Sequence, residues 1–362
     1  MNELIANLHN HTIYSDGSGT HSYLIDRALD AAIDVLIVTD HNVLVEGADR
    51  VVTRGDRRVM LLAAEEVHDQ NRQPQKNHTL VIGANREVAQ FAYSPQELID
   101  EVNKAGGMTF LAHPNESALP MFHEPDISWV DWDVSGFTGL EIWNHFSEFK
   151  DAARSLWRTL FYAFFPDNYP VGPRKDTLAR WDSLLAGGAR VVGIGGSDSH
   201  ALLFRRAFLH KIIFPYTQHF RSVNTHLLIN QDLNNDLEHD RALVFDALRK
   251  GSAFVGYDLP ASTRGFRFTA ETEDALVSMG ETIAITNGAT FRIHLPMPAH
   301  TRLIFNGKVL RTWEDTSQMV ATGAEAGAYR VECTIDYHGL QRGWIFSNPI
   351  YLVKKGKYGD LE

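Results

Sequence analysis

The first 259 residues alternate between short β-branched runs and stretches whose apolar positions recur every three or four residues. This pattern predicts strands followed by helices, and it is typical of α/β proteins in which helices cover a sheet or a barrel. Seven strands are expected, at 4–8, 35–39, 59–64, 79–84, 108–112, 139–143 and 190–194. Helices are expected at 22–32, 43–53, 95–104, 152–164 and 177–185.

From about residue 260 the pattern changes to strict alternation of apolar and polar residues, without helical periodicity. The segment Thr290–His294 shows this alternation, and Asn306-Gly307 is a turn pair typical of β-hairpins. We therefore expect two domains, with residues 1–259 of α/β class and residues 260–362 forming a small all-β sandwich of unknown role. The length of 362 residues agrees, because single cores stop growing at about 250–300 residues.

Composition narrows the function classes. The chain carries 34 basic and 45 acidic residues, and residues 260–362 contain equal numbers of each, so the net charge of −11 belongs to the first domain. Such a surface argues against an extended nucleic acid as partner. The single cysteine, Cys333, cannot form an intrachain disulfide. We find no apolar run of membrane-spanning length and no signal-peptide pattern, so a cytoplasmic protein without a membrane partner is expected. The oligomeric state is left open.

Histidines and carboxylates follow the predicted strands at the points where the chain leaves them. His9 and His11 follow the first strand, His41 the second and His113 the fifth. In β/α barrels the reactive groups gather at the carboxyl ends of the strands, so these side chains are expected to meet. The full candidate set is His9, His11, Asp16, His41, Glu66, His78, His113, Asp198 and His200.

His78 differs from the other candidates because it precedes its strand. An antiparallel hairpin of 59–66 with 78–84 would bring His78 beside Glu66 and would make a barrel irregular there. Histidine and carboxylate ligands without cysteine suit zinc, manganese or iron in hydrolytic sites. One tetrahedral ion takes three or four ligands, so nine candidates predict two or three divalent ions.

Several of these segments resemble the motifs of the PHP (polymerase and histidinol phosphatase) superfamily. The resemblance spans about residues 5–255 and implies a distorted seven-stranded β/α barrel with metal-dependent phosphoesterase activity. It is carried by His9-Asn10-His11 with Ser15-Asp16-Gly17, Thr39-Asp40-His41, Glu66, His78, His113-Pro114 and Asp198-Ser199-His200.

The same resemblance implies how the ligands are shared. Glu66 is preferred to Glu65 as the bridging carboxylate, because Val67 then matches the apolar residue that follows this ligand in the family. The implied sets are His9, His11, Glu66 and Asp198 for a first ion, Glu66, His78 and His113 for a second, and Asp16, His41 and His200 for a third.

The expected reaction is hydrolysis of a small or medium phosphate mono- or diester by a hydroxide that bridges two ions. Asp40 is expected next to the ligands, where it would orient an imidazole during catalysis. His200 or His41 would protonate the leaving group if the third ion is absent. The expected partner is therefore a small-molecule phosphate ester.

Residues farther from the strand ends give weaker indications. Arg205 and Arg206 could grip a phosphate, and Asn144 and His145 could line the substrate mouth. The aromatic segment 157–165 is expected to be a buried helix face, with a lid or a dimer contact as alternatives. His68 matches no motif and is expected to be structural or exposed.

Two other functions stay open at this point. Metal-rich barrels also host amidohydrolase-type hydrolases, which cleave C–N or carboxylic ester bonds, and fold alone does not choose between the chemistries. A non-catalytic barrel that only holds metal ions, with a β-domain that binds a partner, is the third possibility.

Overall fold

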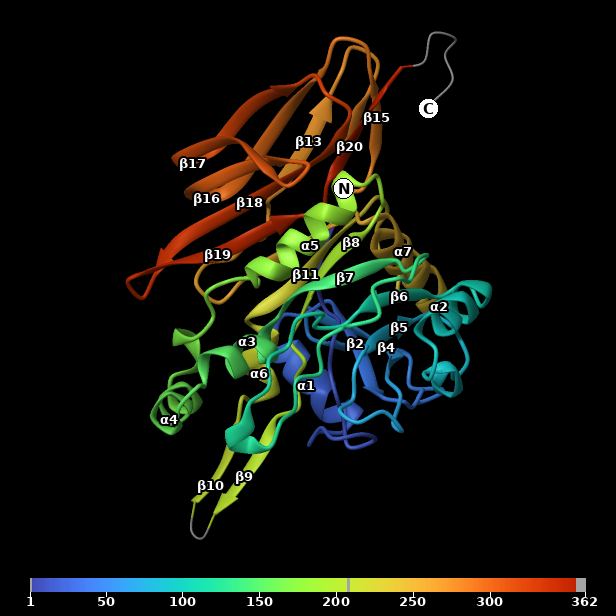
Figure 1. Cartoon of the computed structure of the whole chain (residues 1–362), viewed down its shortest axis with the longest axis vertical. Helices are drawn as coiled ribbons and strands as arrows, with labels where there is room; N and C mark the ends of the chain where they lie inside the picture. The colour runs from blue at the N-terminus through green and yellow to red at the C-terminus, as the bar shows by residue number, and fades with distance from the viewer. Residues whose placement is uncertain (1, 207–208, 356–362) are drawn as a thin grey trace.

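The computed structural model describes residues 2–206 and 209–355 (Figure 1). Strands and helices are mixed up to residue 257, and only strands follow in the described part of the chain. The first region contains strands β1 (Asn2–Asn7), β2 (Val35–His41), β3 (Arg50–Arg54), β4 (Arg57–Val67), β5 (Thr79–Ile82), β6 (Met108–Leu111), β7 (Gly139–Asn144), β8 (Val192–Gly196), β9 (Leu202–Arg206), β10 (Leu209–Ile213), β11 (Val223–Ile229) and β12 (Ala253–Tyr257). Its α-helices are α1 (His21–Ala31), α2 (Pro95–Lys104), α3 (His145–Ala152), α4 (Leu156–Phe164), α5 (Lys175–Ala186), α6 (Tyr216–Phe220) and α7 (Leu237–Lys250).

All seven expected strands are present, as β1, β2, β4, β5, β6, β7 and β8, and they pair in that order. The pairs are parallel except for β4–β5 and β5–β6, which are antiparallel. The predicted antiparallel hairpin of 59–66 with 78–84 is therefore confirmed, with Glu66 opposite Leu80. This hairpin breaks the regular alternation of parallel strands and crossover helices.

The two ends of this strand order approach each other without a continuous ladder. On the side away from β2, strand β1 pairs antiparallel with β11, which in turn pairs with β12. From β8, the Gly195 backbone N–H donates to Thr225 Oγ1 on β11 at 2.9 Å. Beyond β8, Ser199 forms an isolated parallel bridge with Asn10. The carboxyl ends of β1 and β8 are thereby held side by side.

Two helix predictions were wrong. Residues 43–53 form a loop and strand β3, because Val51 and Val52 pair with the start of β4. The helix expected at 152–164 is two helices, α3 and α4, with a break at Ala153–Ser155 where the Ser155 hydroxyl accepts from Arg158 N as the cap of α4. The remaining expected helices are found within a few residues as α1, α2 and α5.

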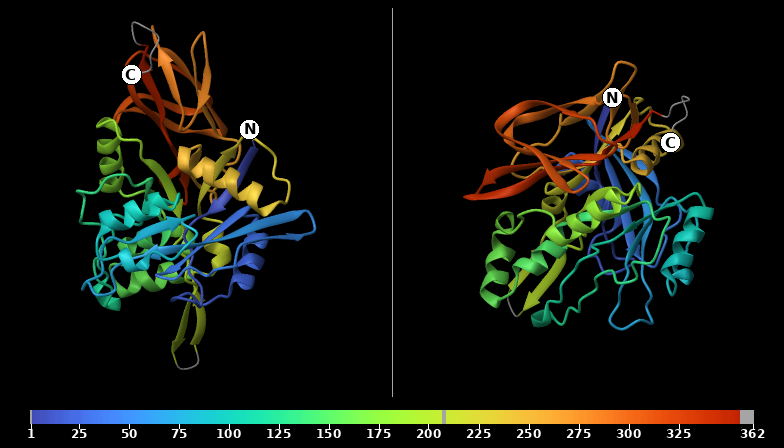
Figure 2. Two further views of the ribbon diagram at one scale, coloured as in Figure 1. Left: turned by 90° about the vertical axis from the view of Figure 1, so that its right-hand side faces the viewer. Right: turned by 45° about the horizontal axis from the view of Figure 1, so that its top comes forward.

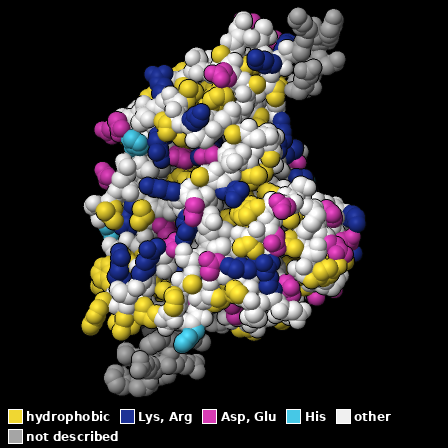
Figure 3. All heavy atoms as spheres, viewed as in Figure 1, with side chains coloured by type: hydrophobic (Ala, Val, Ile, Leu, Met, Phe, Trp, Pro, Cys, Tyr) yellow, Lys and Arg dark blue, Asp and Glu magenta, His cyan; other side chains and the backbone are white. Residues whose placement is uncertain are grey.

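Helix α4 also lacks the burial that its aromatic sequence predicts. Trp157 is 80% exposed, and Phe161 and Phe164 are about half exposed. Hydrophobic side chains gather over this helix at the lower left of Figure 3. The interpretation as a buried helix face was therefore wrong. None of the described helices combines the length and apolar character needed to cross a membrane.

The region after residue 260 forms one end of the molecule, and the β9–β10 hairpin projects from the opposite end (Figure 2). The long strand β16 runs through this C-terminal region: the first part of β16 pairs with β13, and the second part pairs with β18. A core that includes Phe268, Phe291 and Trp344 lies between these strands. The strands are β13 (Arg267–Glu271), β14 (Leu276–Ser278), β15 (Thr282–Ile285), β16 (Ala289–Phe305), β17 (Lys308–Gly323), β18 (Gly327–Tyr337), β19 (Leu340–Ser347) and β20 (Ile350–Lys354).

Backbone and side-chain contacts join the two regions tightly. Strand β12 pairs antiparallel with β19, so hydrogen bonding passes from one region into the other. The Asn348 side chain bonds both the N–H and the carbonyl of Gly193 on β8. Buried Arg330 on β18 donates twice to the Asp182 carboxylate on α5, at 2.7 Å each. Leu228 and Phe254 of the first region belong to the core of the second.

A buried ionic network lies at the same junction. His226 on β11 is fully buried, with Nδ1 at 2.8 Å from Glu3 Oε1 and Nε2 at 3.0 Å from Asp258 Oδ2. Glu3 Oε2 also accepts from the Arg267 guanidinium at 2.6 Å. Burial alone would lower the pKa of His226, but Asp258 and Glu3 raise that pKa to about 9. Burial would raise the pKa of Asp258, and His226 lowers it to about 2.

This network predicts a specific dependence of stability on pH. Because the folded state binds the His226 proton more tightly than the unfolded chain, the stabilisation is fully present below the ordinary histidine pKa of 6.5 and is lost as pH rises through about 9. For Asp258 the stabilisation is present above 3.8 and is lost as pH falls toward 2. In urea titrations, the free energy of unfolding of the wild type should fall by on the order of 2 kcal/mol between pH 6.5 and 9.5. The free energy of unfolding of the His226→Gln variant should not show this fall. Parallel pH profiles for the two proteins would contradict this assignment.

Candidate metal centre

The Glu66 carboxylate lies at the centre of the histidines predicted from the strand ends. It is the penultimate residue of β4, is 1% exposed, and projects to the interior beside the carboxyl ends of β1 and β2. Its two oxygens face different partners. Glu66 Oε2 lies 3.0 Å from His9 Nε2 and 3.1 Å from His11 Nε2. Glu66 Oε1 lies 2.9 Å from both His78 Nδ1 and His113 Nε2.

Asp198, which follows β8, completes the group on the Oε2 side. Its Oδ1 is 3.2 Å from His11 Nε2 and 3.5 Å from His9 Nε2. His9 and His11 reach the same point because residues two apart in an extended segment project to the same side. One ligand atom from each of His9, His11, Glu66 and Asp198 therefore lies within 4.8 Å of the others, and the same holds for Glu66, His78 and His113.

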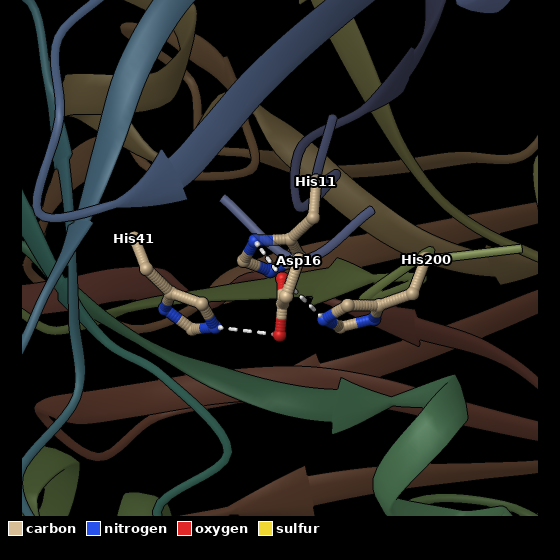
Figure 4. A group of neighbouring side chains, drawn as sticks. All are labelled: His11, Asp16, His41 and His200. Atoms are coloured by element: carbon tan, nitrogen blue, oxygen red, sulfur yellow. Dashed lines mark ion pairs between the residues drawn. The ribbon is translucent and has the colours of Figure 1, made fainter. Parts of the chain in front are cut away.

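A third group lies on the solvent side of the first (Figure 4). Asp16 is 55% exposed at its side chain, and its carboxylate is 3.2 Å from His200 Nε2, 3.6 Å from His41 Nε2 and 3.7 Å from His11 Nδ1. His200 and Asp16 come from loops that the β1 and β8 ends hold together, and His41 ends β2. The first two groups contain the same residues as the sets expected for the first and second ions, and the third group contains His11 in addition to Asp16, His41 and His200.

The donor atoms suit divalent metal ions. His11 Nε2 and His41 Nδ1 are buried and approach Glu66 Oε2 at 3.1 and 3.3 Å, yet they have no hydrogen-bond partner in the described part of the chain. Close approach without hydrogen-bond alignment fits nitrogens and oxygens that converge on a common ion. Imidazole and carboxylate without thiolate is a donor set that zinc, manganese and iron accept.

Charges inside the cluster are strongly coupled. Burial would raise the pKa of Glu66, but His9, His41 and His78 hold it well below its usual range. Burial would lower the pKa of His9, and the carboxylates around it raise it instead. The buried carboxylates thus require positive charge at this point, which protons supply when no cation is bound.

Two backbone conformations at the centre are unusual. His113 and Asp198 have φ values of +26° and +52°, a region that residues other than glycine seldom adopt. Each residue is the second after the end of its strand, β6 or β8, and its side chain is turned toward the cluster. Strain of this kind persists where the surrounding structure over-determines it, and functional sites are where it gathers.

Two buried carboxylates that were not predicted from the sequence lie beside the outer nitrogens of the histidines, and Glu141 is within hydrogen-bond distance of one of them. Glu141, buried on β7, lies 3.1 Å from His9 Nδ1 and also accepts from the backbone N–H of His113 at 2.8 Å. Glu116 lies 3.6 Å from His113 Nδ1, which is beyond hydrogen-bond distance, and it accepts from Lys150 Nζ at 2.5 Å. Carboxylates in this position fix the tautomer and orientation of a ligating imidazole.

Glu141→Gln tests this positioning role. The amide retains the size of the side chain but replaces one acceptor oxygen with a donor, so either the bond to His9 or the bond from His113 N is lost. Metal affinity measured by competition with a chromophoric chelator is expected to fall about 10- to 100-fold, as for other outer carboxylates. Glu141→Asp should recover part of the loss. Unchanged affinity in the glutamine variant would contradict the role.

The other predicted residues occupy different places. Asp40 is buried, and it pairs directly with no imidazole of the described residues. Its Oδ1 accepts from Thr12 N and from Ser15 Oγ, both at 2.7 Å, so it stabilises the loop after His11. Through Ser15, whose Oγ also lies 3.5 Å from His11 Nδ1, Asp40 is linked to one imidazole of the cluster, so its role in orienting an imidazole stays a prediction. His200 Nδ1 lies 3.0 Å from the Asp198 carbonyl, which leaves Nε2 facing Asp16.

Two proposed substrate contacts lie inside the protein. Asn144 Nδ2 donates to Glu141 Oε2 at 2.9 Å and to Asp198 Oδ2 at 3.3 Å, while its Oδ1 caps α3. His145 is fully buried, and its Nδ1 lies 2.7 Å from the Tyr169 hydroxyl. His145 therefore does not reach an opening, whereas Asn144 contributes to the wall of a narrow pocket beside His113 and Glu141. Arg205 and Arg206 lie on β9, and their side chains fall outside the described residues.

His68, expected to be structural or exposed, lies against the centre. Its ring stacks on His78 with centroids 4.4 Å apart and planes inclined by only 12°. Lone pairs of two nearly parallel, stacked rings do not converge on one ion, so His68 supports His78 and does not share a metal with it in this arrangement. A histidine two residues after Glu66 was the available signal. Glu65 projects away from the cluster, to the other face of β4.

Comparisons with known proteins add little to this geometry. No family model matches the chain, and no curated protein matches it. Similar solved structures include a two-domain protein from Bacteroides vulgatus described as containing a PHP-like metal-dependent phosphoesterase, with 13% identity, a TM-score of 0.43, and coverage of 96% of this chain and 95% of that chain.

Two further structures are similar over part of the chain. One, from Bifidobacterium adolescentis, is described as a metal-dependent phosphoesterase (14% identity, TM-score 0.28, 54% of this chain and 87% of that chain). The other is an amidohydrolase from Chromobacterium violaceum with bound sulfate and no metal (14% identity, TM-score 0.27, 54% and 87%).

Proposed function

We propose that the chain is a metal-dependent phosphoesterase that hydrolyses a small or medium phosphate mono- or diester. The observation that carries the proposal is the orientation of Glu66, whose Oε2 faces the His9 and His11 group while its Oε1 faces His78 and His113. A carboxylate shared in this way is the bridge that two neighbouring metal ions require. When bound, such a pair supplies an activated hydroxide and neutralises charge on a phosphoryl group.

The residues of this chain divide into a buried and an open side. His9, His11 and Glu66 are almost completely buried, and they would hold the ions in fixed positions and exclude water. Asp16 and His41 are 55% and 22% exposed, so the substrate would approach from their side. Asp16, His41 and His200 would hold a third ion in this proposal.

His200 is the group that we assign to proton transfer where the third ion is absent. With Nδ1 beside the Asp198 carbonyl, the ring can keep a proton on that nitrogen and use Nε2 at the open side. Protonated Nε2 would then donate to a departing alkoxide. We further propose that residues 1–259 form one domain, a distorted barrel, and that residues 260–362 form a second domain.

An amidohydrolase-type activity is the alternative. A carbamylated lysine bridges the metal ions in some enzymes of that kind, whereas here the proposed bridge is Glu66, and the buried Lys150 pairs with Glu116. These contacts favour the phosphoesterase, but the two chemistries need a direct comparison.

The test is a matched set of chromogenic substrates. Protein stripped with a chelator and reloaded with Mn, Zn or Fe should hydrolyse p-nitrophenyl phosphate or bis-p-nitrophenyl phosphate. Elemental analysis should give two or three ions per chain. Cleavage of p-nitrophenyl acetate or a p-nitroanilide, with silence on both phosphate esters, would overturn the proposal in favour of the amidohydrolase alternative.

A further inference from the structure

A cavity of about 190 Å³ lies on the face of β4 and β5 opposite the metal centre. It exists because β4 and β5 form a hairpin, so no crossover helix follows β4 to cover this face. Instead the loop Leu44–Asp49, the turn Gly83–Arg86 and helix α7 surround it. The residues in the floor include Ala63 and Gly83. Small side chains at these positions leave the hollow open.

Glu65 is the polar side chain in the floor of this cavity. It is 1% exposed, and its Oε1 accepts from the Val88 N–H at 3.3 Å. Its Oε2 is buried and has no hydrogen-bond partner in the described part of the chain. A buried carboxyl oxygen without a partner is costly, and such a group in a native structure requires an explanation. A donor that enters the cavity would satisfy it.

The charges around the cavity favour a cation. Both arginines in the lining are already paired, Arg241 with Asp49 at 3.3 Å and with Glu238 at 2.5 Å, and Arg86 with Glu101 at 2.8 Å. Glu46, also in the lining, has no ion pair among the described residues. Its carboxylate and Glu65 therefore lack a basic partner, and apolar surface from Leu44, Val81 and Phe245 surrounds them.

We propose that this cavity is a second ligand site, which binds a small organic cation through N–H donation to Glu65. Its size limits the ligand, because a cavity of about 150 Å³ holds a benzene molecule. A single ring or a short chain that carries an amine, amidine or guanidine group fits this volume. The site is separate from the metal centre, since Glu65 and Glu66 project to opposite faces of the same strand, and it does not depend on the proposed activity.

Benzamidine is a suitable probe, with neutral benzamide and anionic benzoate as compounds of similar shape. By isothermal calorimetry, benzamidine should bind the wild-type protein saturably, and benzamide at least about tenfold more weakly, the loss expected without charge assistance. Glu65→Gln should weaken benzamidine binding by at least about tenfold. Ala63→Leu fills the cavity without removing the carboxyl, and it should abolish benzamidine binding. This second variant keeps the test available if Glu65→Gln does not fold.

The exposed Glu314→Gln substitution, on β17, is the matched control and should leave benzamidine binding unchanged. Metal content measured on the same samples shows whether the variants keep the neighbouring centre. Benzoate binding as tight as that of benzamidine would overturn the proposal. So would benzamidine affinity that is unchanged in Ala63→Leu, because the probe would then bind elsewhere.

Discussion

Glu66→Gln is expected to abolish tight metal binding and to reduce phosphoesterase activity by more than the roughly 10- to 100-fold typical of outer carboxylates. The amide keeps the shape of the side chain, but only one of its two terminal atoms accepts. Glu66 Oε2 and Oε1 serve two different groups of histidines, so one group must face an NH₂ donor. Elemental analysis and the p-nitrophenyl phosphate assay measure the two effects.

Glu314→Gln provides the control for this variant, because Glu314 is exposed on β17 and pairs only with His300 among the described residues. It should retain wild-type metal content and rate. If Glu66→Gln kept two or more ions per chain, the shared carboxylate would not be a ligand, and the proposed function would lose its main support.

Gly196→Ala is expected to have the second largest effect. A Cβ at this position would lie 2.2 Å from Glu141 Oε1 and 2.8 Å from the His9 Cβ, both closer than non-bonded atoms allow. The added methyl group must therefore displace Glu141, His9 or strand β8. We expect a stability loss of about 1–3 kcal/mol from overpacking, together with weaker metal binding. Urea unfolding and chelator competition test the two losses separately.

Gly187→Ala is the matched control for the added methyl group. Gly187 follows α5 with a φ of −76°, and a Cβ there would meet only backbone oxygens at 3.4 Å. This substitution should be neutral or slightly stabilising. If the two variants had equal stability and equal metal affinity, β8 would have to move freely. The close packing of Glu141 against Gly196 would then not position His9.

Much of the centre could be predicted from the sequence because its ligands follow strands. Parallel strands bring their carboxyl ends to one edge, so His9, His41 and His113 had to approach one another once the strands were recognised. The hairpin placed His78 by the same reasoning. The seven strands pair in chain order, while a continuous closing ladder between β8 and β1 is not found among the described residues.

The outer carboxylates were missed for a physical reason. Glu141 lies inside an apolar strand sequence, Gly139-Leu140-Glu141-Ile142-Trp143, where the pattern indicates a strand but not the partner of a buried charge. A charge in a buried strand requires a partner, which was the available signal. Helix α4 was misassigned because aromatic periodicity indicates an apolar face but not what covers it.

The junction between the two regions has a consequence for how the molecule unfolds. Strand β19 continues the hydrogen-bonded order of β11 and β12, and Leu228 and Phe254 complete the core of the C-terminal strands. Removing residues 260–362 would therefore uncover an edge of β12 and leave Asp182 and Gly193 without their partners Arg330 and Asn348. Melting of either region would deprive the other of part of its core, so a single cooperative calorimetric transition is expected for the whole chain.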